Sequence, residues 1–202
     1  MIKVGLTGGY ASGKTYVAGE LENLGCHVIH ADRLGHLVLQ PGGDAYGPVL
    51  EEFGRGILTG EGIIDRKKLA SIVFINAAQL QKLNGIVHPA VFRLEEKMLE
   101  QFLQNDPKGI AVIEAAILIE TGRYRQFDRL IVTVCDRETQ ITRGMARDNL
   151  TREEVVARLE QQMSLDEKVK YADYIIDTSG PKAATSERVR RVYEDLRMVA
   201  GV

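Results

Sequence analysis

The residues best suited to chemistry lie near the N-terminus, where glycines, a lysine and a threonine follow a short apolar segment. Residues 8–15 match the pattern G-x-x-x-x-G-K-[ST] at every fixed position. Such a loop directs several backbone N–H groups toward one point, and the helix that follows aims the positive end of its dipole there. Lys14 can reach the β- and γ-phosphates, and the hydroxyl of Thr15 can bind Mg²⁺. The pattern therefore predicts a site for a nucleoside triphosphate with Mg²⁺.

The elements that flank this loop support the prediction. The apolar residues before it are Ile2, Val4 and Leu6, and those at helical spacing after it are Val17, Leu21 and Leu24. A strand, a glycine-rich turn and an amphipathic helix form the context that a phosphate-binding loop requires. The alternative is an ordinary glycine turn with a solvated Lys14, which these flanking elements disfavour.

Two acidic residues follow expected strands. Asp32 comes just after a strand over residues 26–30, and Glu114 follows the apolar segment 110–113. Because ligands of open α/β sheets bind at the carboxyl ends of the strands, we expect Asp32 and the phosphate loop to open onto one crevice. Glu114 can hold Mg²⁺ through water or orient a nucleophile. The alternatives are that Asp32 caps a helix over residues 33–39 and that Glu114 is a solvated loop residue.

A pair of arginines lies on a charged helical segment after the strand expected over residues 130–135. Arg143 and Arg147 are four residues apart and share one helix face, where their like charges are unfavourable unless they bind an anion. We expect them to close over the transferring phosphoryl group and to exclude water. The alternative is a solvated face on which Glu138 and Asp148 balance the arginines.

Local signals define the two helices that carry or follow these arginines. Asp136 can cap the first helix, and Thr151 with Glu154 forms a capping box for the second. The pair is expected to form a helical-hairpin lid.

The segment 41–103 is expected to form a helical insertion that covers a substrate. Within it, Asp65 can cap one helix, and a longer helical pattern covers residues 77–103. His88 and Pro89 interrupt this pattern, and the proline is expected to kink or restart the helix. His88 can reach a phosphate or a substrate oxygen from that point, or it can be a structural histidine.

Composition limits the class of protein. The chain has 202 residues, 45% of them hydrophobic, and a formal net charge of -2. It is long enough to bury a sizeable core, and its charge gives no reason to expect nucleic acid or an anionic membrane as a partner. No apolar run approaches a membrane span, and the two cysteines are expected to be buried thiols in a reducing compartment. We therefore expect a cytoplasmic protein.

The alternation of strands and helices predicts an α/β fold. About five parallel strands are expected to form a sheet with helices on both faces. The chain is expected to be one domain in which the core contains residues 1–40, 104–135 and 172–202. The helical insertion is expected at about 41–103 and the lid at about 136–171.

These segments together resemble the dephospho-CoA kinase family, and the resemblance spans nearly the whole chain. The matching residues are 5–9 and 13–15, Ala31, Asp32, His88, Pro89, Leu118, Glu120, Ala146, Arg147, Asp148, Arg158, Gln162, Glu167, Lys168, Ala172, Asp173, Ile176, Asp177, Ser179 and Gly180. The phosphate loop alone is typical of many kinases, whereas the run from Ala146 to Asp173 is specific to this family.

The resemblance implies a P-loop nucleoside-triphosphate-hydrolase-like fold with a substrate-binding helical subdomain and a lid. It implies that ATP with Mg²⁺ phosphorylates the ribose 3′-hydroxyl of dephospho-CoA, the last step of coenzyme A synthesis. Asp32 would face the acceptor hydroxyl, and Lys14, Arg143 and Arg147 would act on the phosphates. The expected nucleotide-binding residues are Gly8, Gly9, Tyr10, Ala11, Ser12, Gly13, Lys14, Thr15 and Tyr16, with Thr15 also binding the metal. His88 and Glu114 are further candidates for the acceptor side.

The chain departs from the family pattern at four positions. His30 stands where the family usually has an aspartate, and Ala116, Ile119 and Thr178 replace proline, phenylalanine and asparagine. The change at His30 could alter the orientation or proton affinity of Asp32, and the change at Ala116 could loosen the loop there. We expect activity to remain.

Two rival functions stay open at this point. One is another small-molecule or nucleoside monophosphate kinase on the same scaffold. The other is a nucleotide-dependent switch or assembly ATPase, which the lack of a guanine-reading N-K-x-D segment disfavours. For the kinase that the resemblance implies, the expected partners are ATP and dephospho-CoA, with the chain a monomer or a weak homo-oligomer.

Overall fold

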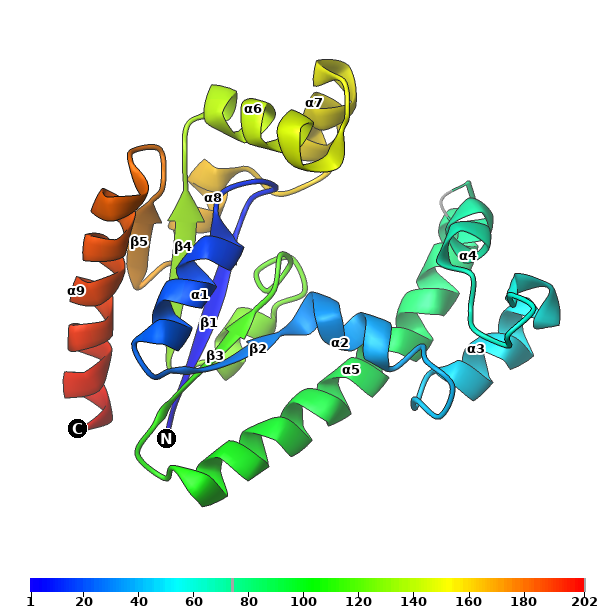
Figure 1. The fold of residues 1–202 in the computed structure, drawn as a ribbon, viewed down its shortest axis with the longest axis horizontal. Helices are drawn as coiled ribbons and strands as arrows, with labels where there is room; N and C mark the ends of the chain where they lie inside the picture. Colours follow the sequence, from blue (N-terminus) through cyan, green and yellow to red (C-terminus); the bar gives the residue numbers. More distant parts are fainter. Residues whose placement is uncertain (74, 202) are drawn as a thin grey trace. The chain divides into compact units, whose positions relative to one another are not determined.

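The computed structural model describes residues 1–73 and 75–201. Its central element is a five-stranded parallel sheet with the strand order β2-β3-β1-β4-β5 (Figure 1). The strands are β1 (Ile2–Gly8), β2 (His27–His30), β3 (Ile110–Glu114), β4 (Arg129–Val134) and β5 (Tyr174–Asp177). The predicted α/β fold with five parallel strands is confirmed.

Helices connect the strands. In the described residues they are α1 (Lys14–Asn23), α2 (Ala31–Leu37), α3 (Tyr46–Phe53), α4 (Arg66–Val73), α5 (Ala77–Asn105), α6 (Arg137–Asp148), α7 (Arg152–Glu160), α8 (Leu165–Val169) and α9 (Lys182–Ala200). Two short 3₁₀ helices span Arg55–Ile57 and Arg123–Gln126. None of these helices is both long and apolar enough to cross a membrane.

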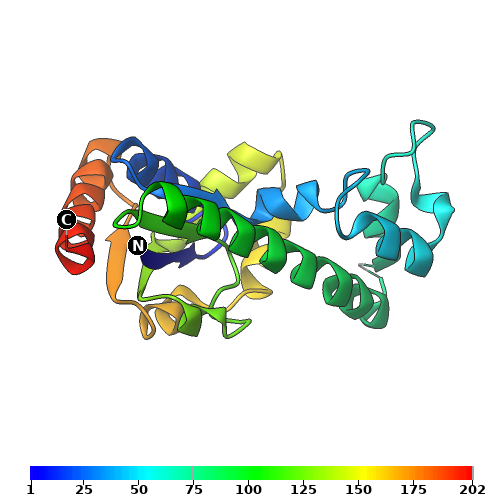
Figure 2. The same cartoon turned by 90° about the horizontal axis from the view of Figure 1, so that it is seen from below.

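The central strand β1 pairs with β3 on one side and with β4 on the other. On one face of the sheet, α1 and α9 lie side by side (Figures 1 and 2). The buried residues of this layer are Ile2, Val4, Leu6, Val17, Ala18, Leu21, Cys26, Ile110, Val112, Ile131, Ile176, Val189, Val192 and Leu196. This apolar layer holds the end of β1 from which the phosphate loop begins.

The opposite face of β1 is covered just as closely. A Cβ atom on Gly5 would lie 2.9 Å from Leu130, 3.0 Å from Phe127 and 3.1 Å from Leu118. The glycine therefore lets side chains of β4 and of the segment between β3 and β4 approach the strand backbone directly. Burial of β1 on both faces explains its nearly continuous apolar sequence.

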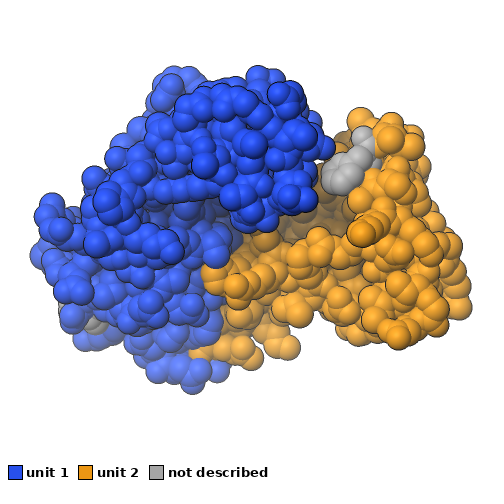
Figure 3. Space-filling view, turned by 45° about the horizontal axis from the view of Figure 1, so that its top comes forward, with its two compact units in different colours: residues 1–29, 102–202 blue, residues 30–101 orange. Residues whose placement is uncertain are grey.

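The chain divides into two compact units, which Figure 3 shows in different colours. Unit 1 contains residues 1–29 and 102–202, and unit 2 contains residues 30–101. The helical pair α6–α7 thus belongs to the same compact unit as the sheet. Unit 2 begins at His30, about ten residues before the insertion expected from the sequence.

Backbone hydrogen bonds explain why α2 belongs to unit 2. The amide of Ala45 donates to the carbonyl of Val38 at 3.0 Å, and the amide of Gly43 donates to the carbonyl of Gln40 at 2.8 Å. These bonds tie the end of α2 to the loop that leads into α3. The sequence pattern could not show this grouping, because it contains no signal for where the loop folds back.

Within unit 2, the predicted cap of α4 is confirmed, and of the two outcomes predicted for Pro89, a restart of α5 is wrong, while a kink stays a prediction. Asp65 Oδ1 accepts hydrogen bonds from the amides of Lys67 at 3.0 Å and Lys68 at 3.2 Å. Helix α5 continues through Pro89 without a restart. The residue after it, Ala90, is fully buried. Packing at this position maintains the helix although the proline removes one of its hydrogen bonds.

Candidate functional site

The phosphate loop connects β1 to α1 with two residues in the left-handed region. Ala11 has φ of 54° and Gly13 has φ of 85°. A Cβ atom on Gly8 would lie 2.2 Å from Thr133 Oγ1, and one on Gly13 would lie 2.9 Å from Thr178 Oγ1. Both glycines are therefore required, Gly8 by the close approach of β4 and Gly13 by its backbone angle and by Thr178.

Hydrogen bonds hold this loop in a compact turn. Lys14 Nζ donates to the carbonyl of Gly9 at 2.9 Å, so the lysine folds back across the loop. Ser12 Oγ and Thr133 Oγ1 are 2.7 Å apart, and Thr178 Oγ1 donates to the carbonyl of Ser12 at 3.0 Å. The loop backbone is thus positioned by side chains from β4 and from the end of β5.

The loop forms one wall of a cavity of about 560 Å³ in unit 1. Its lining residues are Ala11, Ser12, Gly13, Lys14, Thr15, Tyr16, Arg143, Ala146 and Arg147. The predicted loop residues from Ala11 to Tyr16 and both predicted arginines therefore face the same space, whereas Gly8, Gly9 and Tyr10 are not among its lining residues. A cavity with three cationic side chains and a helix N-terminus suits a polyphosphate.

Glu114 lies beside the first turn of α1. It is the last residue of β3, only 8% exposed, and its Oε1 accepts a hydrogen bond of 3.0 Å from Thr15 Oγ1. The alternative of a solvated loop glutamate is wrong, because the strand continues through this residue.

The oxygens of Glu114 and Thr15 are hard donors of the kind that Mg²⁺ prefers. Among the described residues, no group of three or more His, Cys, Asp or Glu side chains could hold a metal by itself. The donor set therefore fits an ion that is also held by phosphate oxygens and water, as Mg²⁺ usually is with nucleotides.

The half-buried Arg143 extends from α6 to the end of β5. Its two terminal nitrogens donate to Thr178, one to Oγ1 at 2.9 Å and the other to the carbonyl at 2.6 Å. Thr178, one of the departures from the family pattern, thus links Arg143 to the carbonyl of Ser12. Arg143 connects the helical pair to the loop as well as lining the cavity.

Arg147 pairs with its neighbour Asp148. Its Nε and one terminal nitrogen lie 2.8 Å and 3.0 Å from the two carboxylate oxygens. Arg158 adds a third contact at 3.2 Å, and the hydroxyl of Tyr10 also donates to this carboxylate. The hydrogen bonds from Arg147, together with that from Tyr10, hold the pKa of Asp148 well below its usual range.

Of the two acidic residues that could balance these arginines, only Asp148 does so. Glu138 pairs instead with Arg152, at 2.6 Å and 2.8 Å. The predicted caps of these helices are confirmed: Asp136 accepts from the amide of Thr139 at 2.8 Å, and Thr151 with Glu154 forms the capping box.

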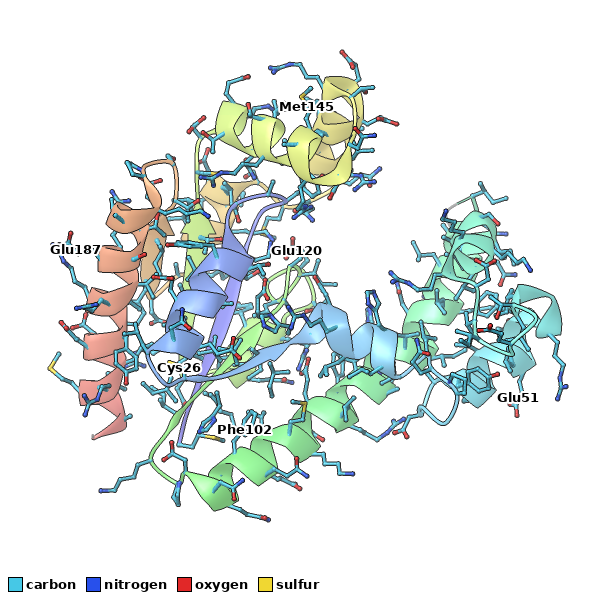
Figure 4. All side chains as sticks on the ribbon, viewed as in Figure 1. Cys26, Glu51, Phe102, Glu120, Met145 and Glu187 are labelled. Atoms are coloured by element: carbon cyan, nitrogen blue, oxygen red, sulfur yellow. The ribbon has the colours of Figure 1, made fainter. Side chains whose placement is uncertain are left out.

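Lys168 is a residue of this site to which the sequence pattern assigned no role. It lies on α8, is fully buried, and its Nζ contacts Glu120 Oε1 at 2.8 Å, the carbonyl of Ala116 at 2.8 Å and that of Gly8 at 3.3 Å. Figure 4 labels Glu120 in the loop after β3. Lys168 thus joins the start of the phosphate loop to the loop that follows Glu114.

The structure does not support the expectation that Ala116 loosens its loop. Its carbonyl accepts hydrogen bonds from Lys168 and, at 3.2 Å, from Thr7 Oγ1. These contacts use the backbone, so they do not depend on the missing proline.

Asp32 and His88, the other two predicted site residues, belong to unit 2. Asp32 is an exposed residue in the first turn of α2. It is not the N-cap, because α2 begins at Ala31 directly after β2. The alternative role of Asp32 as a helix cap is therefore wrong. The ring of His88 lies 6.0 Å from that of Phe92 on the same helix.

Comparisons with known proteins agree with the geometry in unit 1. A family model described as dephospho-CoA kinase matches residues 2–183. A curated dephospho-CoA kinase of Aquifex aeolicus is 41% identical over 97% of this chain and 98% of its own length. A crystal structure of a Thermus thermophilus protein has a TM-score of 0.84 and 30% identity, covering 96% of this chain and 97% of its own. A dephospho-CoA kinase structure from Campylobacter jejuni has a TM-score of 0.64 and 28% identity, covering 96% of both chains.

Proposed function

The chain belongs to the dephospho-CoA kinase family, and we propose that it transfers the γ-phosphoryl group of ATP to the ribose 3′-hydroxyl of dephospho-CoA. The products would be coenzyme A and ADP, the outcome of the last step of coenzyme A synthesis. The observation that carries this proposal is a phosphate loop that shares one cavity with Arg143 and Arg147 in a chain with this family's sequence.

On the donor side, the loop and two arginines would act on the phosphates. The backbone N–H groups of Gly13, Lys14 and Thr15 would bind phosphate oxygens, and Lys14 would follow negative charge onto the β- and γ-phosphates as the bond breaks. Arg143 and Arg147 would stabilise the equatorial oxygens of the transferring group and exclude water.

Thr15 and Glu114 would hold Mg²⁺ together with the phosphates of ATP. When bound, the ion supplies positive charge that neutralises the phosphates and fixes their geometry. The hydrogen bond from Thr15 to Glu114 already brings the two oxygens together. Glu114 can then orient either a metal-bound water or a group of the acceptor.

On the acceptor side, Asp32 would accept a hydrogen bond from the 3′-hydroxyl and receive its proton late in the transfer. Its exposure at the start of α2 leaves the carboxylate available to a substrate. His30 precedes the helix and would tune this carboxylate, and His88 would contact the acceptor from α5.

Substrate selection gives the experiment that tests this function. The purified protein with Mg-ATP is offered dephospho-CoA, pantothenate, shikimate or nucleoside monophosphates, and ADP and the phosphorylated product are measured. We expect rapid ADP formation only with dephospho-CoA. Rapid ADP release without any acceptor would favour the ATPase, and phosphorylation of a different acceptor would favour another small-molecule kinase.

We further propose a cytoplasmic protein whose partners are ATP and its acceptor, with no nucleic acid or membrane partner. The support is the near-neutral net charge of -2 and two buried cysteines that form no disulfide. A monomer or weak homo-oligomer suffices, because unit 1 carries the whole donor cavity on one chain.

A further inference from the structure

Tyr10, at a position that the phosphate-loop pattern leaves open, is held by the helical pair. Its amide donates to Gln162 Oε1 at 2.8 Å, and its carbonyl accepts from Gln140 Nε2 at 2.7 Å. Gln140 lies on α6 and Gln162 follows α7. Both backbone groups of one loop residue are thus bonded to two different parts of the lid sequence.

The assignment of the amide atoms in these bonds is unambiguous. A backbone N–H can only donate, so Gln162 must present its oxygen to Tyr10. A backbone carbonyl can only accept, so Gln140 must present its nitrogen. The two glutamines therefore have opposite roles, one as acceptor and one as donor.

The packing around Tyr10 is close enough to make these bonds specific. A Cβ atom on Gly9 would lie 2.7 Å from Gln140 Nε2, and one on Gly144 would lie 2.6 Å from the Tyr10 ring. Both glycines allow α6 to lie directly on the loop. Gln140 is only 6% exposed, so its amide is confined beside the Tyr10 carbonyl by the packing around it.

The bonds also act where the loop is strained. Ala11 follows Tyr10 directly and has φ of 54°, a left-handed conformation that a residue with a Cβ adopts only when its surroundings enforce it. The Tyr10 side chain adds to this enforcement, because Arg147 lies 4.8 Å from its ring centre.

We propose that Gln140 and Gln162 are positioning residues that keep the phosphate loop in its nucleotide-binding shape. They contact the loop backbone and not the reacting atoms, so they act through Tyr10 and Ala11. A loop that spends less time in the competent shape binds nucleotide more weakly in proportion to the lost population. This inference extends the proposed kinase function, but its main readout is ADP affinity, which does not depend on the identity of the acceptor.

Because the two glutamines have opposite roles, substitution by Glu should affect ADP binding differently at the two positions, whereas substitution by Leu should weaken it at both. Gln162→Leu and Gln140→Leu each remove a bond and should weaken ADP binding about tenfold. Gln162→Glu keeps an oxygen acceptor for the Tyr10 amide and should stay within about threefold of the parent protein. Gln140→Glu replaces the donor with an acceptor that faces a carbonyl, so it should bind as weakly as Gln140→Leu.

The exposed neighbour Gln161 supplies the matched control. Gln161→Glu adds the same charge one residue away, and Gln161→Leu removes the same amide, and both should bind ADP normally. ADP affinity is measured by calorimetry, thermal melting without nucleotide reports stability, and KM for ATP is compared with kcat at saturating ATP. We expect KM to rise while kcat stays within a few-fold.

Three results would overturn the inference. Normal ADP affinity in both leucine variants, with or without a lower melting temperature, would show that the glutamines are only structural. Equal loss in Gln162→Glu and Gln162→Leu would contradict the acceptor role of Gln162. Wild-type affinity in Gln140→Glu would contradict the donor role of Gln140. If Gln140→Leu does not fold, the half-buried Gln162 still decides the outcome. If ADP affinity follows the predicted pattern in these variants but the protein does not phosphorylate dephospho-CoA, only the proposed acceptor is refuted.

Discussion

The phosphate-loop region of unit 1 and the helical unit 2 are stabilised in different ways. Around the loop, buried or half-buried polar bonds join residues that are far apart in the chain, such as Ser12 with Thr133 and Lys168 with Gly8. In unit 2, the ion pairs of Arg93 with Asp44 and of Lys82 with Glu52 are largely exposed.

Exposed ion pairs contribute little to stability, and the buried residues of unit 2 are mostly apolar. Glu95 is a buried exception, only 1% exposed. This difference indicates that the proposed ATP site at the phosphate loop is built from the same polar contacts that stabilise unit 1. Substitutions there should affect binding and stability together, whereas an exposed acceptor residue such as Asp32 should affect turnover alone.

The largest effect on turnover is expected for Lys14→Ala, which removes the ammonium group that folds back over the phosphate loop. Turnover should fall by at least about 10³-fold, because developing charge on the phosphates loses its partner. ADP formation with Mg-ATP and dephospho-CoA measures the effect, with the exposed Lys108→Ala as control. Wild-type turnover in Lys14→Ala would mean that this lysine is not needed for phosphoryl transfer.

Lys168→Met tests whether the buried polar bonds around the phosphate loop stabilise the fold. It leaves Glu120 and two carbonyls without their cation, and the free energy of unfolding should fall by about 3 to 5 kcal/mol. Urea denaturation measures the change, and Lys168→Met with Glu120→Leu should recover part of it.

A matched control for Lys168 lies two residues away. Lys170 forms an exposed ion pair with Glu167 on the same short segment, so Lys170→Met should leave the urea midpoint unchanged. Equal losses in the two lysine variants would show that burial is not what distinguishes the loop region.

Asp32→Asn tests whether an exposed residue of unit 2 affects turnover without affecting stability. The amide keeps the shape of the carboxylate but presents a weaker acceptor or a misdirected donor, so turnover should fall about 10²-fold. ADP affinity and thermal stability should stay close to those of the parent protein, since Asp32 is exposed and caps no helix. Near-normal turnover would move the acceptor role to His30 or Glu114.

The smallest effects are expected for Arg143 and Arg147 on α6. Arg143→Ala and Arg147→Ala should each lower kcat about tenfold or more with little change in KM for the acceptor, because they act mainly on the transition state. Arg143→Ala should also lower the melting temperature more than Arg147→Ala, since Arg143 donates two bonds to Thr178. Arg152→Ala, which removes an exposed pair, serves as the control. A large loss of stability with normal kinetics would show that the arginines are structural.

Local features of the fold could be predicted from the sequence, because they depend on a few neighbouring residues. The phosphate loop, the Asp65 and Asp136 caps and the capping box at Thr151 all have this character. A restart of the helix at Pro89, one of the two predicted outcomes, was wrong because packing around α5 outweighs one lost hydrogen bond.

Other features could not be predicted, because they depend on contacts between distant residues. Lys168 meets Gly8 across 160 positions, and Gln162 meets Tyr10 across 152. No spacing rule links such pairs. The short helix α8 was also missed, although Ser164 caps it by accepting from the amide of Glu167. The cap alternative for Asp32 was wrong because β2 runs into α2 without a loop.

The position of β1 in the sheet has a consequence for the order of folding. The strand is made well before its sheet partners, which begin at Ile110 and Arg129, and the lysine that holds its end follows Gly8 by 160 positions. At about 5 to 20 residues per second, a ribosome needs roughly 8 to 32 seconds to go from Gly8 to that lysine. During this time an apolar strand waits without partners, exposed to aggregation. The central strand of the sheet is therefore among the last elements to be held in place.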